Sequence, residues 1–240
     1  MVKKTLFGIL FTVAGLLCLP LLAAIGLTLQ LGFVLAVPGL LMAALLVPNF
    51  RRFLARTHTI PFRGIRLASD VSFAPTHSWV RRVGPKLARI GADDFMQRVF
   101  GRVDGVELPP IGAQVRRGDM LVCLRHGSRT LELTAPVDGI VRRINQALGA
   151  DPAEVNRAPF DDGWLVELDL VAPATSSAGL LTVGDAIPWM RNHFERLIAL
   201  SRRELRSPTL ADGGELAPDV AEELDAASWD AVQRALFSPA

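Results

Sequence analysis

The sequence has few of the residues that usually form disulfides or metal sites. It contains only two cysteines, Cys18 and Cys123. The first lies in a long apolar segment and the second in an alternating segment, so a disulfide between them is geometrically implausible. The histidines occur singly, with no spacing of Cys and His typical of a metal centre. Lysine is also scarce, because Lys3, Lys4 and Lys86 are the only ones.

Charged side chains are absent from a long N-terminal segment, Thr5 to Phe50. This segment is about twice the ~20 residues that cross a bilayer once. Glycines and polar residues near 26–32 divide it, so residues 1–50 predict a transmembrane helical hairpin. Basic residues flank the segment on both sides and none lies in the connector. The positive-inside rule therefore predicts a two-pass protein of the inner (cytoplasmic) membrane, with its soluble part in the cytoplasm.

Two other interpretations of this segment are a cleaved signal peptide ending near residues 21–24 and a lipidated Cys18. Both are disfavoured, since the apolar run continues to an arginine cluster and leucines precede the cysteine. Arg51, Arg52 and Arg56 begin a basic juxtamembrane linker that we predict over residues 51–70. These arginines can attract anionic lipid headgroups or serve only to fix the topology.

Residues 71–172 have the pattern of a mainly β domain. Glycines at 101, 105, 112 and 118 separate short segments rich in Val, Ile and Leu, as in a small barrel or sandwich with tight turns. A short helix is predicted within 90–103, with Asp93 and Asp94 at its positive N-terminal end. Residues 120–134 alternate as a β-hairpin, whose turn R-H-G-S-R contains Gly127 for a positive φ.

Several segments carry a family resemblance. Residues 106–170 contain V-E-L-P-P-I-G-A-Q-V-R-R-G-D, T-A-P-V-D-G-I-V-R-R-I-N and V-N-R-A-P-F-D-D-G-W-L. T-H-S-W-V-R precedes them at 76–81, and I-G-A-D-D-F-M-Q-R-V-F-G-R-V at 90–103. Together these segments resemble the H protein of the glycine cleavage system. The resemblance implies a barrel-sandwich hybrid fold of the lipoyl type, and a lipoyl group on one lysine at the hairpin tip.

The lysine position of that family is occupied here by Ser128, counting back from Pro136 by the family's spacing. A serine hydroxyl cannot replace an amine in a lipoyl amide, so we expect no cofactor. The tip offers Arg125, His126, Ser128 and Arg129, a basic turn that can dock a carboxylate-rich surface or a phosphate, or simply be solvated. No acid is placed to orient His126 toward Ser128, so we expect no catalytic pair and no enzyme activity.

The chain leaves the family pattern beyond residue 172. We predict a linker over 173–184, an amphipathic basic helix over 185–206, and an acidic C-terminal segment over 207–240 that ends in a short helix. The apolar face of the basic helix includes Phe194. This face can pack on the chain's own barrel or lie in a partner's groove, which makes it a second candidate docking surface.

The sequence therefore predicts a membrane-anchored, non-catalytic H-protein-like subunit that binds or scaffolds proteins on the cytoplasmic face, with no nucleic-acid partner. One alternative is a periplasmic-type transport adaptor with a lipoyl-like hairpin domain, which would need the opposite topology. Another is a degenerate subunit of a lipoyl-dependent, glycine cleavage-like enzyme complex. Both alternatives share the fold, and fold does not give function.

Overall fold

The computed structural model describes residues 30, 32, 34–40, 42, 57–204, 210–211, 215–216, 220 and 224–237. The chain divides into two units, residues 1–56 and 57–240. In the first unit, the described residues are helical. No helix within the described ranges is both long and apolar enough to cross a membrane. The predicted transmembrane hairpin, together with Arg51, Arg52 and Arg56, lies almost wholly outside these ranges.

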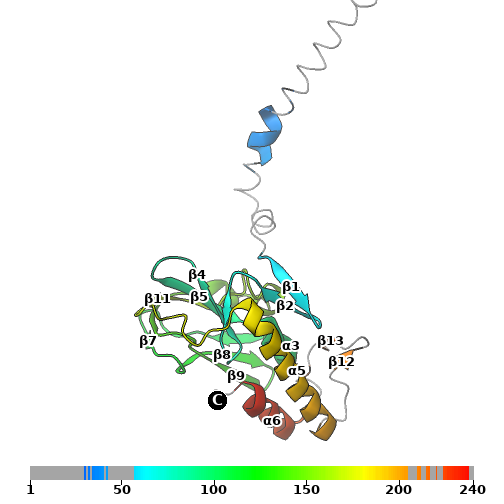
Figure 1. The fold of residues 1–240 in the computed structure, drawn as a ribbon. Helices are drawn as coiled ribbons and strands as arrows, with labels where there is room; N and C mark the ends of the chain where they lie inside the picture. The colour runs from blue at the N-terminus through cyan, green and yellow to red at the C-terminus, as the bar shows by residue number, and fades with distance from the viewer. Residues whose placement is uncertain are drawn as a thin grey trace, which may run out of the picture. The chain divides into compact units, whose positions relative to one another are not determined.

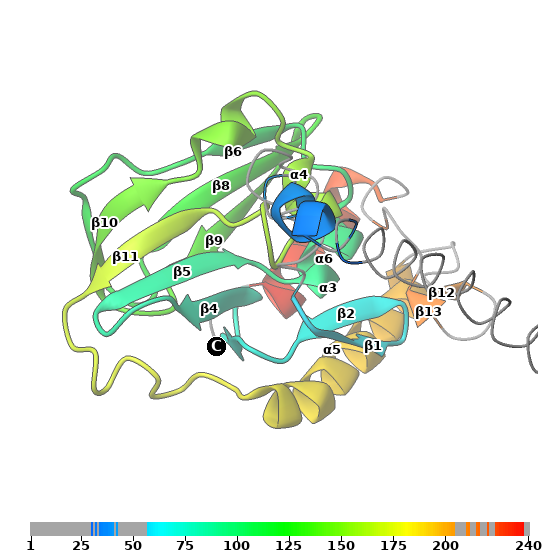
Figure 2. The same ribbon diagram turned by 90° about the horizontal axis from the view of Figure 1, so that it is seen from above.

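The second unit is built on two antiparallel sheets, seen in Figures 1 and 2. One sheet has the order β3-β4-β5-β11-β10-β7 and the other the order β6-β8-β9. The strands are β3 (Ser72–Phe73), β4 (Ser78–Arg82), β5 (Leu87–Ala92), β6 (Gly105–Glu107), β7 (Gln114–Val115), β8 (Met120–His126), β9 (Arg129–Thr134), β10 (Gly139–Ile144) and β11 (Val166–Leu170). The prediction of a mainly β domain is confirmed.

The core lies where the buried faces of both sheets meet, and it is one continuous cluster. Along β9, Leu131 and Leu133 are buried whereas Thr130 and Glu132 are exposed, as the two-residue period of a strand requires. Trp79 of β4 is fully buried, and its indole N–H donates to the carbonyl of Pro159 over 3.0 Å. Position 91 on the neighbouring strand β5 accepts only glycine, because a Cβ there would lie 2.4 Å from the Trp79 ring.

Helices close one end of the sandwich. They are α3 (Asp94–Phe100), the 3₁₀ turn η1 (Gln146–Gly149), α4 (Glu154–Arg157), α5 (Val183–Glu204) and α6 (Ala226–Leu236). Asp93 caps α3 by accepting a bond of 2.8 Å from the amide of Met96. Asn156 of α4 joins the two helices, since its side chain bonds to Val103 N and Gln97 Oε1.

Residues 59–68 correct the predicted linker over 51–70. They form a β-hairpin of β1 (Thr59–Phe62) and β2 (Ile65–Ala68), in which Ile65 and Leu67 are buried. The connecting residues Arg63 and Gly64 have φ values of 47° and 85°, as in the tight two-residue turns that suit the twist of a hairpin. This segment is therefore part of the globular unit from residue 57 onward.

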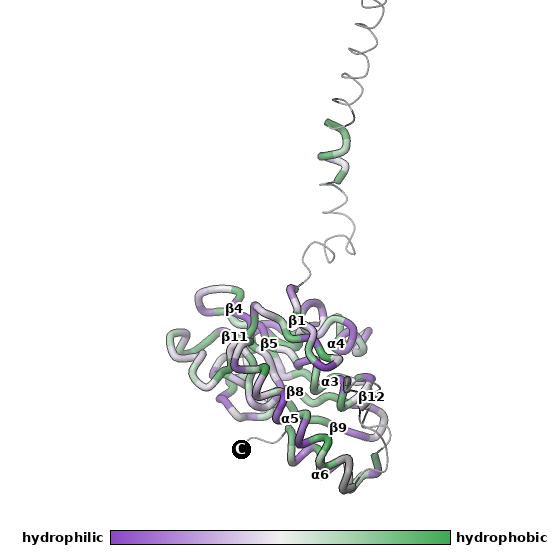
Figure 3. The backbone as a smooth tube through the Cα atoms, turned by 45° about the vertical axis from the view of Figure 1, so that its right-hand side comes forward, coloured by the Kyte–Doolittle hydropathy of each residue, from purple (hydrophilic) through white to green (hydrophobic). Residues whose placement is uncertain are grey.

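The C-terminal helices pack on the sandwich. α5 begins at Val183, where Thr182 exchanges hydrogen bonds with Asp185, so it starts slightly before the predicted residue 185. The tube of α5 in Figure 3 shows both hydrophilic and hydrophobic stretches. α6 buries its apolar side, which carries Trp229, Val232 and Leu236. The other described strands, β12 (Leu210–Ala211) and β13 (Glu215–Leu216), pair with each other.

Candidate interaction site at the hairpin tip

The hairpin of β8 and β9 ends in a two-residue turn, Gly127 and Ser128. His126 pairs with Arg129 across the turn. Gly127 has a φ of 58°, which is the left-handed region that glycine adopts without strain. The side chain of Ser128 is exposed. The turn thus presents a hydroxyl at the most distant point of the hairpin.

One side of this tip is held by the segment that follows α3. The imidazole Nδ1 of His126 donates to the carbonyl of Arg102 over 2.5 Å, and its ring meets Phe100 edge-on with centroids 6.0 Å apart. The amide of Gly127 donates to Asp104 Oδ2 over 2.6 Å. A charge-assisted bond to a turn amide is stronger than a neutral one. These contacts fix the position of the turn.

The other side is held by the C-terminal segment. The Arg129 guanidinium donates to the carbonyl oxygen of Leu224, just before α6. Gln233 of α6 donates from Nε2 to the carbonyl of Thr130 over 3.1 Å. Segments about one hundred residues apart are therefore joined at the tip. Arg129 therefore connects the hairpin tip to the C-terminal segment of the same domain.

Arg125 is the more exposed of the two tip arginines. Its guanidinium lies 3.7 Å from the carboxylate of Glu107, and both side chains are more than half exposed. Exposed pairs of this kind contribute little to stability, in the range of about 0–1 kcal/mol. The absence of a side chain at Gly105 allows this approach, since a Cβ there would lie 2.6 Å from Arg125 Nε. Arg125 can exchange Glu107 for an external carboxylate at low cost.

The second predicted docking residue, Phe194, lies in the core. It is 0% exposed in α5, with its ring 5.8 Å from Phe62 and 5.3 Å from Phe95, measured between centroids. The guanidinium of Arg63 lies over the same ring at 5.9 Å. The apolar face of α5 is thus packed on the chain's own domain. It is not an open groove-binding surface in this structure.

A buried polar cluster beneath α5 does not follow from the sequence pattern. His77, with a positive φ of 63°, is 0% exposed and contacts Asp93 Oδ2 through Nδ1 over 2.8 Å. Its ring stacks on Phe95 at 4.8 Å and lies 4.8 Å from the ring of His193 on α5. Among the residues that the structure describes, His77 Nε2 and His193 Nδ1 have no hydrogen-bond partner. Asp93 thus serves two functions, since it also caps α3.

Burial sets the titration of His193. Its removal from water lowers the pKa of the imidazole to about 3, helped by the nearby His77 and Arg196. His193 therefore stays neutral at physiological pH. No signal within the local sequence pairs it with His77, because the two residues come from distant segments. Only the apolar stripe that includes Phe194 indicates that this part of α5 is buried.

Other chemistry is not assembled in the described part of the chain. No group of three or more His, Cys, Asp and Glu residues there could hold a metal ion. Burial raises the pKa of the Cys123 thiol, with Glu107 and Glu132 adding to the effect, so the reactive thiolate is disfavoured. Ser128 and His126 share the turn, but the imidazole Nδ1 is bonded to a backbone carbonyl.

Comparison with known proteins agrees with this architecture. The model of the family "Glycine cleavage H-protein" matches residues 71–192, which is half of the chain. The chain belongs to the glycine cleavage H-protein family. A glycine cleavage system H protein from Opitutus terrae is 33% identical over 117 residues, covering 49% of this chain and 91% of that protein. A probable H protein from Halobacterium salinarum is 39% identical over 100 residues, covering 42% and 78%.

A crystal structure of an H protein from Mycobacterium marinum is also similar, at 23% identity and a TM-score of 0.47. That similarity covers 52% of this chain and 99% of that chain. The H-protein match ends within α5, at residue 192. The β1–β2 hairpin, the rest of α5 and the whole of α6 lie outside it. The two hydrogen bonds that hold the β9 side of the tip therefore involve Leu224 and Gln233, which lie beyond the matched region.

Proposed function

We propose that this chain is a non-catalytic, non-lipoylated subunit that binds other proteins through its H-protein domain at the cytoplasmic face of a membrane. The observation that carries the proposal is Ser128 at the hairpin turn. By the family's spacing from Pro136, this is the position of the lipoyl-bearing lysine, and a hydroxyl cannot form the amide. The only lysine among the described residues, Lys86, lies in the turn between β4 and β5.

The anchoring of the tip supports a binding role. Arg102 and Asp104 hold the turn from one side, and Leu224 and Gln233 hold β9 from the other. A surface that is already ordered loses less conformational entropy when a partner binds. A basic turn that is fixed by hydrogen bonds and carries a short hydroxyl side chain is better suited to binding a partner protein than to carrying a covalent intermediate between sites.

Membrane attachment rests on the charge-free segment from residue 5 to residue 50. The described helical residues within it expose large apolar side chains, with Leu35 66% and Leu40 63% exposed. Transfer of such surface from water to an apolar environment is favourable by about 25 cal/mol per Å². Arg51, Arg52 and Arg56 then lie at the cytoplasmic headgroups, where each contributes about 1 kcal/mol to anionic lipid contact.

Reporter fusions test this topology. Fusions after Arg56 and at Ala240 should both be active only with a cytoplasmic reporter, because the basic flanks stay inside. Activity of a periplasmic reporter at either point contradicts the proposal and favours the transport-adaptor alternative.

The first partners to examine are proteins of a glycine cleavage system, since the relatives carry that name. We propose that an acidic surface on such a partner meets Arg125. Capture of the partner by the full-length chain should weaken about tenfold or more in Arg125→Ala, through loss of charge-assisted bonds. The matched control is Arg142→Ala, because Arg142 is also half-exposed and paired with an acid, Asp169, elsewhere on the sandwich.

The two variants separate the outcomes. Loss of capture in Arg125→Ala with retention in Arg142→Ala places the contact at the tip. Equal capture by both variants and the wild type would move the contact away from Arg125. The positive control is the lipoylated H protein of the same cells, used as bait in the same assay. If that H protein captures proteins of the glycine cleavage system and this chain captures none, the scaffold role with these partners is contradicted.

A further inference from the structure

Two arginines of the sandwich fasten the segment that joins β11 to α5. Arg82, at the end of β4, donates from Nη1 to Pro173 O over 2.8 Å and to Ser176 Oγ over 3.0 Å. Arg117 donates from Nη2 to Ser176 O over 3.2 Å, and from Nη1 to Ala178 O. Both guanidiniums thus converge on Ser176, one at its hydroxyl and one at its carbonyl.

Within the described part of the chain, no acidic side chain pairs with either of these two guanidiniums. Arg117 contacts Asp138 only through its backbone amide. Neutral carbonyl and hydroxyl oxygens are weaker partners for a guanidinium than a carboxylate or a phosphate. The arrangement leaves room for a stronger, anionic acceptor.

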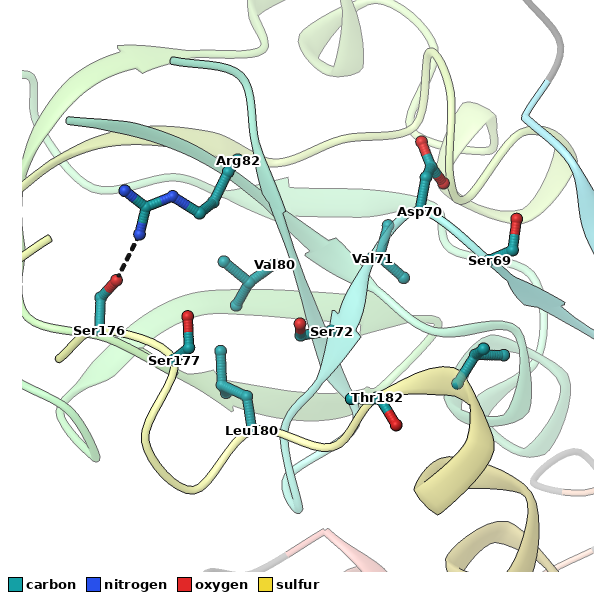
Figure 4. Close-up of a pocket in the computed structure, with 11 residues that line it drawn as sticks. Ser69, Asp70, Val71, Ser72, Val80, Arg82, Ser176, Ser177, Leu180 and Thr182 are labelled. Atoms are coloured by element: carbon teal, nitrogen blue, oxygen red, sulfur yellow. Dashed lines mark hydrogen bonds between the residues drawn. The ribbon is translucent and has the colours of Figure 1, made fainter. Parts of the chain in front are cut away.

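A pocket of about 420 Å³ opens beside Ser176, as Figure 4 shows. Its size lies in the range of small-molecule sites. Arg82 stands at one side and Asp70 at the other, where the Asp70 carboxylate is already paired with Arg81 over 2.8 Å. Hydroxyl groups line the pocket from residues 69–72 on one side and from the segment between β11 and α5 on the other. Besides Ser176, they belong to Ser69, Ser72, Ser177 and Thr182.

We propose that Arg82, with the hydroxyls of the 172–182 segment, forms a site for a phosphoryl group, while Arg117 holds the segment through the carbonyls of Ser176 and Ala178. The Arg82 fork would exchange its bonds from Nη1 to the Ser176 hydroxyl and from Nη2 to the carbonyl of Pro85, 2.7 Å away, for two charge-assisted bonds to phosphoryl oxygens. Because α5 begins at Val183, directly after this segment, occupancy of the site fixes the connection between the sandwich and α5. The site lies away from the hairpin tip and is independent of the function proposed for it.

The phosphoryl group has two sources. It is either carried by a small phosphate monoester in the pocket or attached to Ser176 itself, which is half-buried in a turn with exposed neighbours. In the second case a protein kinase transfers the γ-phosphoryl group of a nucleoside triphosphate. A P–O bond forms at Ser176 Oγ, the bond to the β-phosphate bridging oxygen breaks, and the nucleoside diphosphate leaves. The hydroxyl proton passes to the base of the kinase.

The experiment uses the full-length chain in two arms at one fixed ionic strength. In the first arm, glycerol 3-phosphate is titrated by calorimetry into the wild type, Arg82→Ala and Arg142→Ala. In the second arm, phosphoserine is incorporated at position 176, and cleavage of the 172–182 segment by elastase is timed with and without Arg82→Ala. Elastase suits the segment because it contains alanines but no Lys or Arg.

Each result decides the proposal. Saturable binding in the first arm that falls tenfold or more in Arg82→Ala, but not in Arg142→Ala, identifies a small phosphate monoester as the source. Cleavage slowed about tenfold by phosphoserine, and restored by Arg82→Ala, identifies modified Ser176 as the source. Absence of both effects, or effects that persist in Arg82→Ala, overturns the proposal.

Discussion

Truncation of Phe194 to alanine tests whether α5 belongs to the core of this domain. The ring is 0% exposed and contacts Phe62 and Phe95 edge-on or tilted, so its removal leaves a cavity between α5 and the sandwich. Such changes cost about 3–5 kcal/mol. This is a large part of the ~5–15 kcal/mol that stabilises a typical domain. At a urea m-value of about 2 kcal/mol/M, the midpoint falls by about 1.5–2.5 M.

The assay is urea unfolding of the full-length chain, followed by tryptophan fluorescence. Arg191→Ala is the matched control, because Arg191 is exposed on the same helix and a surface change usually stays within about ±0.5 kcal/mol. The reasoning fails if Phe194→Ala unfolds at the same midpoint as this control. α5 would then not be packed on the sandwich, and Phe194 would again be a candidate for docking a partner.

Three further predictions concern contacts inside the fold. Folded His193 stays neutral down to about pH 3, whereas in the unfolded chain it takes up a proton below about pH 6.5, so the free energy of unfolding decreases as the pH falls through this window. His193→Gln should reduce the slope of unfolding free energy against pH by about 1.4 kcal/mol per pH unit. Urea unfolding at several pH values measures this slope. Gly163→Ala should destabilise the fold by about 1–3 kcal/mol, since the new Cβ would lie 2.6 Å from the carbonyl of Glu154, whereas Gly149→Ala, where a Cβ meets nothing within 4 Å, should be neutral in the same assay. Asn156→Ala should cost about 2–4 kcal/mol by leaving buried partners at the end of α3 unsatisfied, which thermal unfolding measures. An unchanged pH slope, equal effects of the two glycine changes, or a neutral Asn156→Ala would each refute the corresponding contact.

Local patterns predicted the elements whose signals are contained in a few residues. The alternation of Leu131 and Leu133 with polar neighbours, and a glycine at the turn, located the hairpin of β8 and β9. The Asp93 cap located the start of α3, and the apolar spacing that includes Phe194 located α5. In each case the side-chain period matches the period of the element.

The β1–β2 hairpin was missed because its signals are weak. Its strands are short, Pro61 lies inside the first, and a proline normally argues against a strand interior. The Arg63–Gly64 pair is the signal that could have revealed it, since both residues adopt positive φ. The burial of Ile65 and Leu67 depends on the distant sandwich, which the local sequence does not specify.

The candidate site shows the same division between local and distant information. The turn residues Arg125 to Arg129 were identified from sequence, but the role of Arg129 was not. Its partner, the carbonyl of Leu224, is a backbone atom that carries no residue-type signal. The contact between His77 and His193 likewise depends on how α5 crosses the sandwich. Contacts of this kind require the tertiary structure.

The most direct test of the proposed function is the intact mass of the chain purified from lipoate-replete cells, with the lipoylated H protein of the same cells as a positive control. The account predicts the unmodified mass for the wild type, because no lysine stands at the hairpin turn. The variant Ser128→Lys restores the amine at that turn and shows whether the surrounding domain is still recognised by the lipoylating enzymes. A lipoyl mass on the wild-type chain, at Lys86 or at any other residue, would contradict the account.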